Sequence, residues 1–78
     1  MSDIEIEIRN RIARNPEILG GKPVIRGTRI PVYVIIDSFA NGSTDVEIVD
    51  DFPDLTVEDV RAALAFHLRE SDAEPISA

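Results

Sequence analysis

The sequence contains no cysteine and a single histidine, His67. The absence of cysteine excludes disulfide bonds and thiolate metal ligands, and one imidazole cannot build a histidine-based metal cluster. A chain of 78 residues makes one domain. Such a small domain buries only about 60% of the surface of its unfolded chain. Because disulfides and metals are both missing, we expect oligomerisation to add stability, and we predict no cofactor.

Long apolar runs are also missing. No stretch approaches the ~20 apolar residues that a transmembrane helix requires. The first ten residues are charged and lack the apolar core of a signal peptide. We therefore expect a cytoplasmic protein that does not enter a membrane.

The usual signs of catalysis are absent. The sequence has no cysteine nucleophile, no serine–histidine pairing in a recognisable motif and no paired carboxylates on a pocket-forming scaffold. A chain of this size also leaves no obvious room for a ligand cavity. An acidic run lacks the glycine and terminal glutamate of a calcium loop, so it favours a solvated face over a metal site. Its members are Asp45, Glu47, Asp50, Asp51 and Asp54. We predict that the protein is not an enzyme.

Basic residues are few and unevenly placed. Eight lysines and arginines stand against 15 acids, and the net charge of −7 argues against a nonspecific polyanion binder. Residues 9–29 hold six of the eight basic residues and one acid, Glu17, whereas residues 30–78 hold two basic residues and eleven acids. Uneven charge is common in small soluble domains, but the pattern also fits two faces with two different partners.

The first half of the chain predicts extended structure. Residues 4–8, Ile-Glu-Ile-Glu-Ile, alternate strictly and predict a strand within an N-terminal segment, residues 1–10. The edge of this strand is a candidate homodimer contact. Residues 15–31 hold three prolines and three glycines, which exclude a continuous helix. Gly27 and Thr28 predict a short hairpin or bend between residues 24–26 and 29–30.

The second half changes to helical periodicity. Pro31 precedes an apolar pattern that ends at Asn41 and Gly42, which favour a left-handed helix cap. Thr44 and Glu47 predict a capping box, and Pro53 ends the second helix. We expect its apolar stripe to comprise Val46, Val49 and Phe52.

A third helix is predicted to begin at Thr56, with Asp59 three residues later. Its expected buried face comprises Val57, Val60, Leu64 and Leu68. The predicted fold is mainly α: a three-helix bundle of the helix-turn-helix type, over residues 11–70, behind a short strand or hairpin segment. Residues 71–78 are expected to be a frayed tail.

One stretch is highly distinctive. Residues 15–32, NPEILGGKPVIRGTRIPV, resemble the signature of the family known as domain of unknown function 433. Residues 51–56 (DFPDLT) and 60–64 (VRAAL) are similar to it too, so that the resemblance covers roughly residues 12–69. It implies a homeodomain-like or winged helix-turn-helix fold. It also implies an antitoxin that neutralises a PIN-type ribonuclease toxin and, with it, represses their own operon.

Lys22, Arg26 and Arg29 are the leading candidates for contact with a partner. The glycines and prolines around them either only fix a tight bend or also point these cations in a common direction. In the second case the guanidinium groups would grip DNA phosphates or an acidic nuclease site. The full candidate set for DNA or partner binding is Arg11, Arg14, Lys22, Arg26, Arg29 and Arg61.

The third helix gives little support to direct reading of DNA. Glu58 and Asp59 in its first turn suit the helix dipole but repel phosphates. Tyr33 is expected to pack rather than stack on a base, and His67 to be a surface or boundary residue. Two functions therefore remain open: an antitoxin-like DNA-binding regulator, or a protein-interaction module that uses residues 22–29 without touching DNA.

Overall fold

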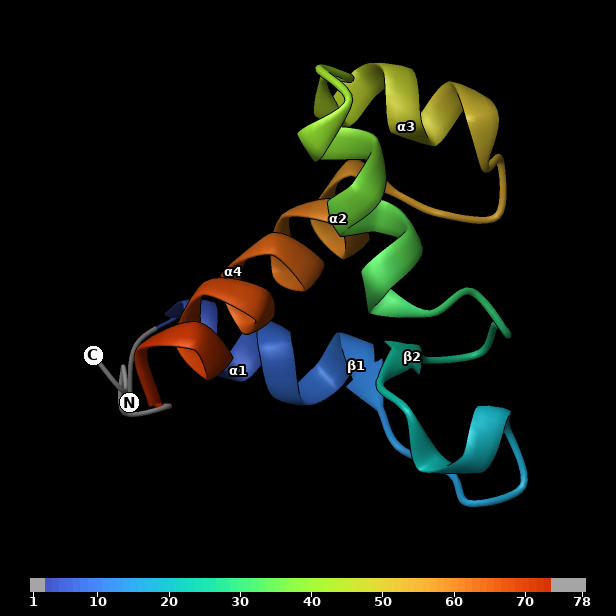
Figure 1. Ribbon diagram of the computed structural model, residues 1–78, viewed down its shortest axis with the longest axis vertical. Helices are drawn as coiled ribbons and strands as arrows, with labels where there is room; N and C mark the ends of the chain where they lie inside the picture. The colour runs from blue at the N-terminus through green and yellow to red at the C-terminus, as the bar shows by residue number, and fades with distance from the viewer. Residues whose placement is uncertain (1–2, 74–78) are drawn as a thin grey trace.

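The computed structural model describes residues 3–73, and this part of the chain forms a mainly helical domain (Figure 1). Four α-helices accompany a single turn of 3-10 helix and two very short strands. In chain order these are α1 (Asp3–Arg11), β1 (Ile12–Ala13), η1 (Leu19–Gly21), β2 (Val24–Ile25), α2 (Val32–Ala40), α3 (Asp45–Asp51) and α4 (Val57–Ala73). The predicted class, mainly α with a short hairpin segment, is confirmed.

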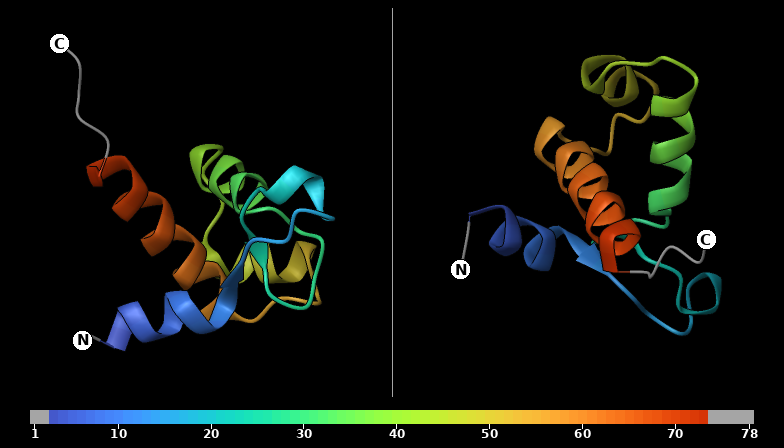
Figure 2. Two further views of the ribbon diagram at one scale, coloured as in Figure 1. Left: turned by 90° about the horizontal axis from the view of Figure 1, so that it is seen from below. Right: turned by 60° about the vertical axis from the view of Figure 1, so that its left-hand side comes forward.

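Helix α4 is the centre of the arrangement. It packs against α1, α2 and α3. The right-hand view of Figure 2 shows α4 between α1 and α2, with α3 beyond its N-terminal end. Ion pairs join Glu5 to Arg69 and Arg11 to Asp59, so α1 and α4 run antiparallel.

The core lies where the three C-terminal helices meet the small sheet. Ile35, Ile48 and Val60, one from each helix, are completely buried, and Ile25 of β2 is 1% exposed. The other members of the buried cluster are Ile12, Val32, Leu55 and Ala63. Each fully buried aliphatic side chain stabilises the fold by about 1.5–3 kcal/mol relative to exposure. The two halves of the chain thus share one core.

The capping signals in the sequence set the helix starts. The Thr44 hydroxyl accepts a hydrogen bond from the Glu47 N–H, and the Glu47 carboxylate accepts one from the Thr44 N–H, as the capping box predicts. Thr56 and Asp59 make the same reciprocal pair at the start of α4. Helix α2 ends at Asn41 as predicted.

The prediction of a strand at residues 4–8 is wrong, because these residues belong to helix α1. Each glutamate in the pattern precedes an arginine by four residues, Glu5 before Arg9 and Glu7 before Arg11, which is the favourable order for helical ion pairs. Acids in the first turn and arginines in the last also suit the helix dipole. Edge-to-edge pairing of residues 4–8 in a homodimer is therefore excluded.

The predicted bend at Gly27 and Thr28 is confirmed. The Thr28 N–H donates to the Ile25 carbonyl at 3.0 Å, and Gly27 has a φ of 82°, which glycine adopts without strain. A bridge between Val24 and Pro31 closes the loop. The unexpected partner is β1, which pairs antiparallel with β2 in the register Ile12↔Ile25.

Two of the predicted apolar stripes are partly wrong. Val46 is 58% exposed and Ile48 takes its place in the core of α3. Leu68 is 55% exposed, because the buried face of α4 runs through Val60 and Ala63. Ala62 and Ala63 of α4 are buried as well.

The C-terminal segment is more helical than the sequence predicts. Helix α4 continues to Ala73, so residues 71–73 are helical and not frayed. The rest of the predicted tail, residues 74–78, lies outside the described residues. Among those that are described, no helix is long and apolar enough to cross a membrane.

Candidate functional site

Arg26 fastens the C-terminal end of α1. Its Nε donates to the Asn10 carbonyl at 2.8 Å, and its Nη2 donates to the carbonyls of Arg9 at 3.0 Å and Ile12 at 3.3 Å. The last carbonyls of a helix have no intrahelical partner, so a guanidinium at this place satisfies them and complements the helix dipole. Arg26 therefore has a structural role that the sequence did not indicate.

Arg11 joins α1 to the start of α4. Its Nη1 lies 2.9 Å from Asp59 Oδ1, and its Nε pairs with the carboxylate of Glu7. Hydrogen bonds to Glu7 and then to Asp59 raise the pKa of Arg11 above its ordinary value. The Asp59 side chain is only 14% exposed. Arg11 is thus turned toward the chain's own carboxylates.

Two further candidates also hold carboxylates of this chain. Arg14 Nη2 lies 3.0 Å from Glu70 Oε1, and its guanidinium stands 5.7 Å from the ring centroid of Phe66. Arg61 Nε lies 3.2 Å from Asp45 Oδ2, which links α4 to α3. Both pairs are largely exposed, so their contribution to stability is small.

Lys22 and Arg29 are the remaining candidates, and both are exposed. The Lys22 ammonium stands 5.5 Å from the ring centroid of Tyr33. Within residues 3–73 no carboxylate lies within ion-pair distance of Lys22 or Arg29. Arg26 turns to the end of α1, so of the two alternatives for this segment, the one in which Lys22, Arg26 and Arg29 all serve a partner does not hold for Arg26.

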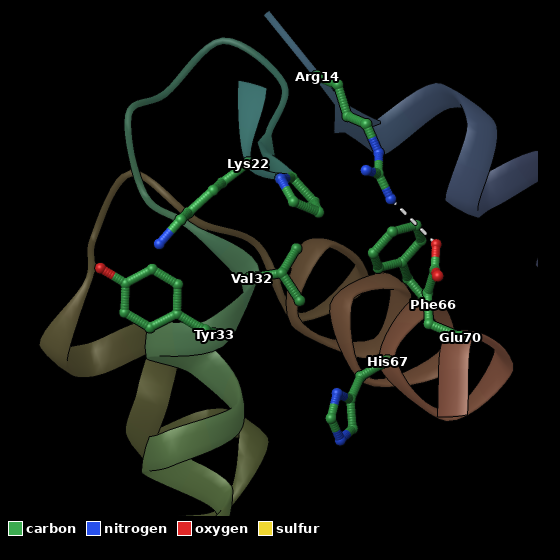
Figure 3. Close-up of a pocket in the computed structure, with 8 residues that line it drawn as sticks. Arg14, Lys22, Val32, Tyr33, Phe66, His67 and Glu70 are labelled. Carbon is green, nitrogen blue, oxygen red and sulfur yellow. Dashed lines mark hydrogen bonds and ion pairs between the residues drawn. The ribbon is translucent and has the colours of Figure 1, made fainter. Parts of the chain in front are cut away.

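A pocket of about 320 Å³ opens between α2 and α4 (Figure 3). The expectation that the chain has no room for a cavity is therefore wrong. Its apolar wall comprises Pro23, Val32, Tyr33 and Phe66, and its polar groups come from Arg14, Lys22, His67 and Glu70. The bridge between Val24 and Pro31 places Lys22 and Pro23 beside the start of α2, which periodicity alone could not reveal.

Tyr33 and His67 were assigned no functional role from the sequence. Tyr33 is 52% exposed and forms one side of the pocket, so the expectation that it packs is wrong. His67 is an exposed residue at the pocket, in line with the predicted surface or boundary position. The available signal in the sequence is Lys22, a charged residue two positions before the apolar pair Val24 and Ile25. In the structure this lysine lies beside the start of α2, where Tyr33 is located.

A smaller pocket of about 220 Å³ lies between α1 and α4, lined by Glu5, Ile8, Arg9 and Arg69. Arg69 Nη1 lies 2.6 Å from Glu5 Oε1. The hydrogen bond from Arg69, and then its charge, hold the pKa of Glu5 below its ordinary value of 4.5. This pocket is therefore a small gap between two helices that an ion pair bridges.

These features define a small helical domain with one free cation, Lys22, at a pocket, and comparisons with known proteins place it in a family. The family described as "Protein of unknown function (DUF433)" matches residues 12–67. The chain belongs to this family. Helix α1 lies before the matched residues.

Two relatives agree with this assignment. The chain is 37% identical over 68 residues to "Uncharacterized protein y4eO" of Sinorhizobium fredii. That match covers 87% of this chain but only 29% of the relative. The chain also resembles the crystal structure of a member of the family from Anabaena variabilis, with a TM-score of 0.75 and 32% identity. This second match covers 87% of this chain and 67% of the other.

Proposed function

We propose that this chain is a protein-interaction module that docks on an acidic surface of a partner protein through the exposed cations of residues 22–29. The proposal rests on which basic side chains already bind oxygen atoms of the chain itself and which do not. Arg11, Arg14 and Arg61 bind carboxylates of the chain itself, and Arg26 binds three of its carbonyls. In the described part of the chain, Lys22 and Arg29 are the candidates left with no oxygen partner.

This distribution favours a protein over DNA. DNA-binding proteins commonly neutralise about 6–10 phosphates, and each contact strengthens binding at low salt. Lys22, Arg29 and Arg9 are the three cations without an ion pair or carbonyl partner among residues 3–73, and on a chain of net charge −7 they fall short of that number. Glu58 and Asp59 add negative charge at the start of α4. A partner with a few clustered carboxylates needs fewer cations, because a guanidinium fork matches one carboxylate with two hydrogen bonds.

The family resemblance suggests the class of partner. A PIN-type ribonuclease toxin presents an acidic nuclease site, and Arg29 is the residue that we infer to reach it. Neutralisation would then follow because the site is occupied by a guanidinium. A homodimer and a cytoplasmic location complete this antitoxin-like proposal.

Operator binding is the second candidate function. Helices α2, α3 and α4 follow one another across short turns at residues 41–44 and 52–56, and this succession supports a helix-turn-helix type of bundle. In that fold α4 would be the recognition helix. Because its first turn is acidic, we infer that the basic segment would contribute at least as much to DNA binding as α4.

Affinity purification of the tagged chain from its own host, with mass spectrometry, identifies the partner. Its affinity for the wild type, Arg29→Glu and Arg61→Gln is then measured by calorimetry. We expect Arg29→Glu to weaken binding at least about ten-fold, which is ~1.4 kcal/mol. Arg29→Glu replaces a positive charge by a negative one, whereas the control Arg61→Gln removes one positive charge outside the segment and is expected to bind like the wild type.

The same three proteins are titrated with DNA from upstream of their own gene at two salt concentrations. We expect weak binding that Arg29→Glu does not change. A dissociation constant in the range of about 10⁻⁸–10⁻¹¹ M at physiological salt would overturn the proposal in favour of the operator-binding regulator.

A further inference from the structure

We propose that the pocket between α2 and α4 receives an acidic–aromatic segment of the partner protein, with one large apolar side chain in the pocket and a neighbouring carboxylate on Lys22. The proposal rests on the proposed function and deepens it by naming the chemistry of the bound segment.

The pocket reaches the hydrophobic core from outside. Val32, only 5% exposed, is a member of the buried cluster and also lines the pocket. Figure 3 shows Val32 between Tyr33 on one side and Phe66 on the other. Tyr33 keeps half of its surface exposed, and the part of its ring that the Lys22 ammonium does not cover offers an apolar surface. Large apolar surfaces in a concave site are where binding proteins seat an anchoring side chain.

The size of the pocket fits a single anchor. Its volume of about 320 Å³ lies at the lower end of the range for small-ligand sites, about 300–1,000 Å³. One aromatic side chain with its adjacent backbone fits such a space, whereas most of an extended ligand would lie outside the pocket. A short protein segment is therefore the occupant that the volume favours.

The charge of the pocket selects an acidic segment. Lys22 lies 5.5 Å from the Tyr33 ring centroid, where its ammonium borders the apolar wall. No carboxylate of residues 3–73 pairs with it, although the whole chain has a net charge of −7. A carboxylate next to the anchoring side chain of the partner would form an ion pair with the Lys22 ammonium. Long-range repulsion from the acidic remainder would disfavour the same segment elsewhere on the surface.

Arg14 offers a second position for a carboxylate. It is bound to Glu70, but the two side chains are 56% and 50% exposed, and such exposed pairs contribute little to stability. A carboxylate of the partner can take the place of Glu70 while the guanidinium stays over Phe66. The pocket is thus suited to a side chain flanked by acids on both sides.

A fluorine label provides the test, because Tyr33 is the only tyrosine of the chain. The full chain labelled with 3-fluorotyrosine gives one ¹⁹F resonance, located at the pocket. The probe is the terminally blocked peptide Ser-Asp-Trp-Asp-Ser. We expect a saturable shift of the resonance, and no shift with Ser-Lys-Trp-Lys-Ser or Ser-Asp-Ala-Asp-Ser at the same concentrations.

Two variants with the same loss of charge sharpen the test. Lys22→Gln is expected to weaken the binding of the acidic tryptophan peptide at least about five-fold, equivalent to ~1 kcal/mol. Arg61→Gln is expected to leave it unchanged. Equal binding by Lys22→Gln, or equal shifts with the lysine peptide, would overturn the inference. A larger shift with single-stranded oligothymidine would replace the peptide by a nucleic acid as the occupant.

The outcome is separable from that of the proposed function. If the peptide does not bind, but the partner protein still depends on Arg29, only the assignment of the pocket fails. If Arg29→Glu leaves the partner's affinity unchanged, the docking segment is wrong even where the peptide binds the pocket.

Discussion

The Nε of Arg26 donates to the carbonyl of Asn10 at 2.8 Å, so a residue at the end of β2 completes the hydrogen bonding of α1. The two residues are 16 positions apart and belong to segments joined by the sheet pairing Ile12↔Ile25. This contact decides between two roles for the most promising arginine of the sequence. Arg26 holds the molecule together and is not available as a free binding group.

Loss of Arg26 is therefore expected to lower stability. Arg26→Ala leaves three carbonyls without this donor, and we expect a loss of about 1–2 kcal/mol in the free energy of unfolding. Urea titration followed by circular dichroism measures it. Arg29→Ala is the matched control, with an expected change within about 0.5 kcal/mol. Equal stability of the two variants would contradict the structural role.

The pair of Arg11 and Asp59 is expected to show coupling in a double-mutant cycle. Asp59 both caps α4 through Thr56 and accepts from Arg11. We expect Asp59→Ala to destabilise more than Arg11→Ala, because it removes the cap as well, and a coupling energy of about 1 kcal/mol between the sites. The cycle is measured by urea unfolding. Strict additivity would show that the ion pair is not formed in solution.

The link between Glu5 and Arg69 is expected to weaken in acid. The pKa of Glu5 in the folded chain lies below its ordinary value of 4.5, so the folded state binds fewer protons than the unfolded state in this range. The stabilisation is then fully present above pH 4.5 and is lost as the pH falls through the lower folded pKa.

Wild type and Glu5→Gln are compared by urea unfolding at pH 7 and pH 3. We expect the wild type to be more stable at pH 7 and the difference to be smaller at pH 3, which lies below the ordinary pKa of 4.5. Glu17→Gln is the control, since Glu17 has no ion pair among residues 3–73 and is expected to show the same small effect at both values. A gap as large at pH 3 as at pH 7 would exclude ionisation of Glu5 as its cause.

Leu19 is expected to be a site where substitution stabilises the protein. Its φ is 51°, in the left-handed region that costs a non-glycine residue about 1–2 kcal/mol. Asparagine tolerates this conformation, and the Leu19 side chain is 48% exposed, so little burial is lost. We expect Leu19→Asn to gain about 0.5–1 kcal/mol. Leu68→Asn makes the same exchange at an exposed position of α4 and is expected to destabilise slightly, because asparagine is a poorer helix former than leucine.

The second half of the fold was predictable because its signals are local. Thr44 with Glu47, Thr56 with Asp59, and Asn41 with Gly42 each act within one helical turn, and all three set helix ends where expected. The bend at Gly27 is equally local. The existence and order of α2, α3 and α4 therefore follow from residues close in sequence.

The first helix was not predictable from alternation alone. Residues 4–8 have the period of a strand, but the ion pair of Glu7 with Arg11 four residues later and the long-range contacts with α4 decide in favour of a helix. Arg11, Arg14 and Arg61 also bind carboxylates that are 16–56 positions away, and no local pattern reports such contacts. The sequence identified which residues carry positive charge, but only the fold shows which of them already bind carboxylates or carbonyls of the same chain.

Helix α1 contains no fully buried residue, packs Ile8 against the hydrophobic cluster, and is linked to α4 by two ion pairs. Its backbone amides are thus expected to exchange with deuterium through a local opening, whereas those of α2 and α4 around Ile35 and Val60 exchange through global unfolding. Added salt screens the charges and should selectively accelerate exchange in α1. The protein would then behave as two cooperative units: an opening N-terminal helix, and a protected body that coincides with the part shared by the family.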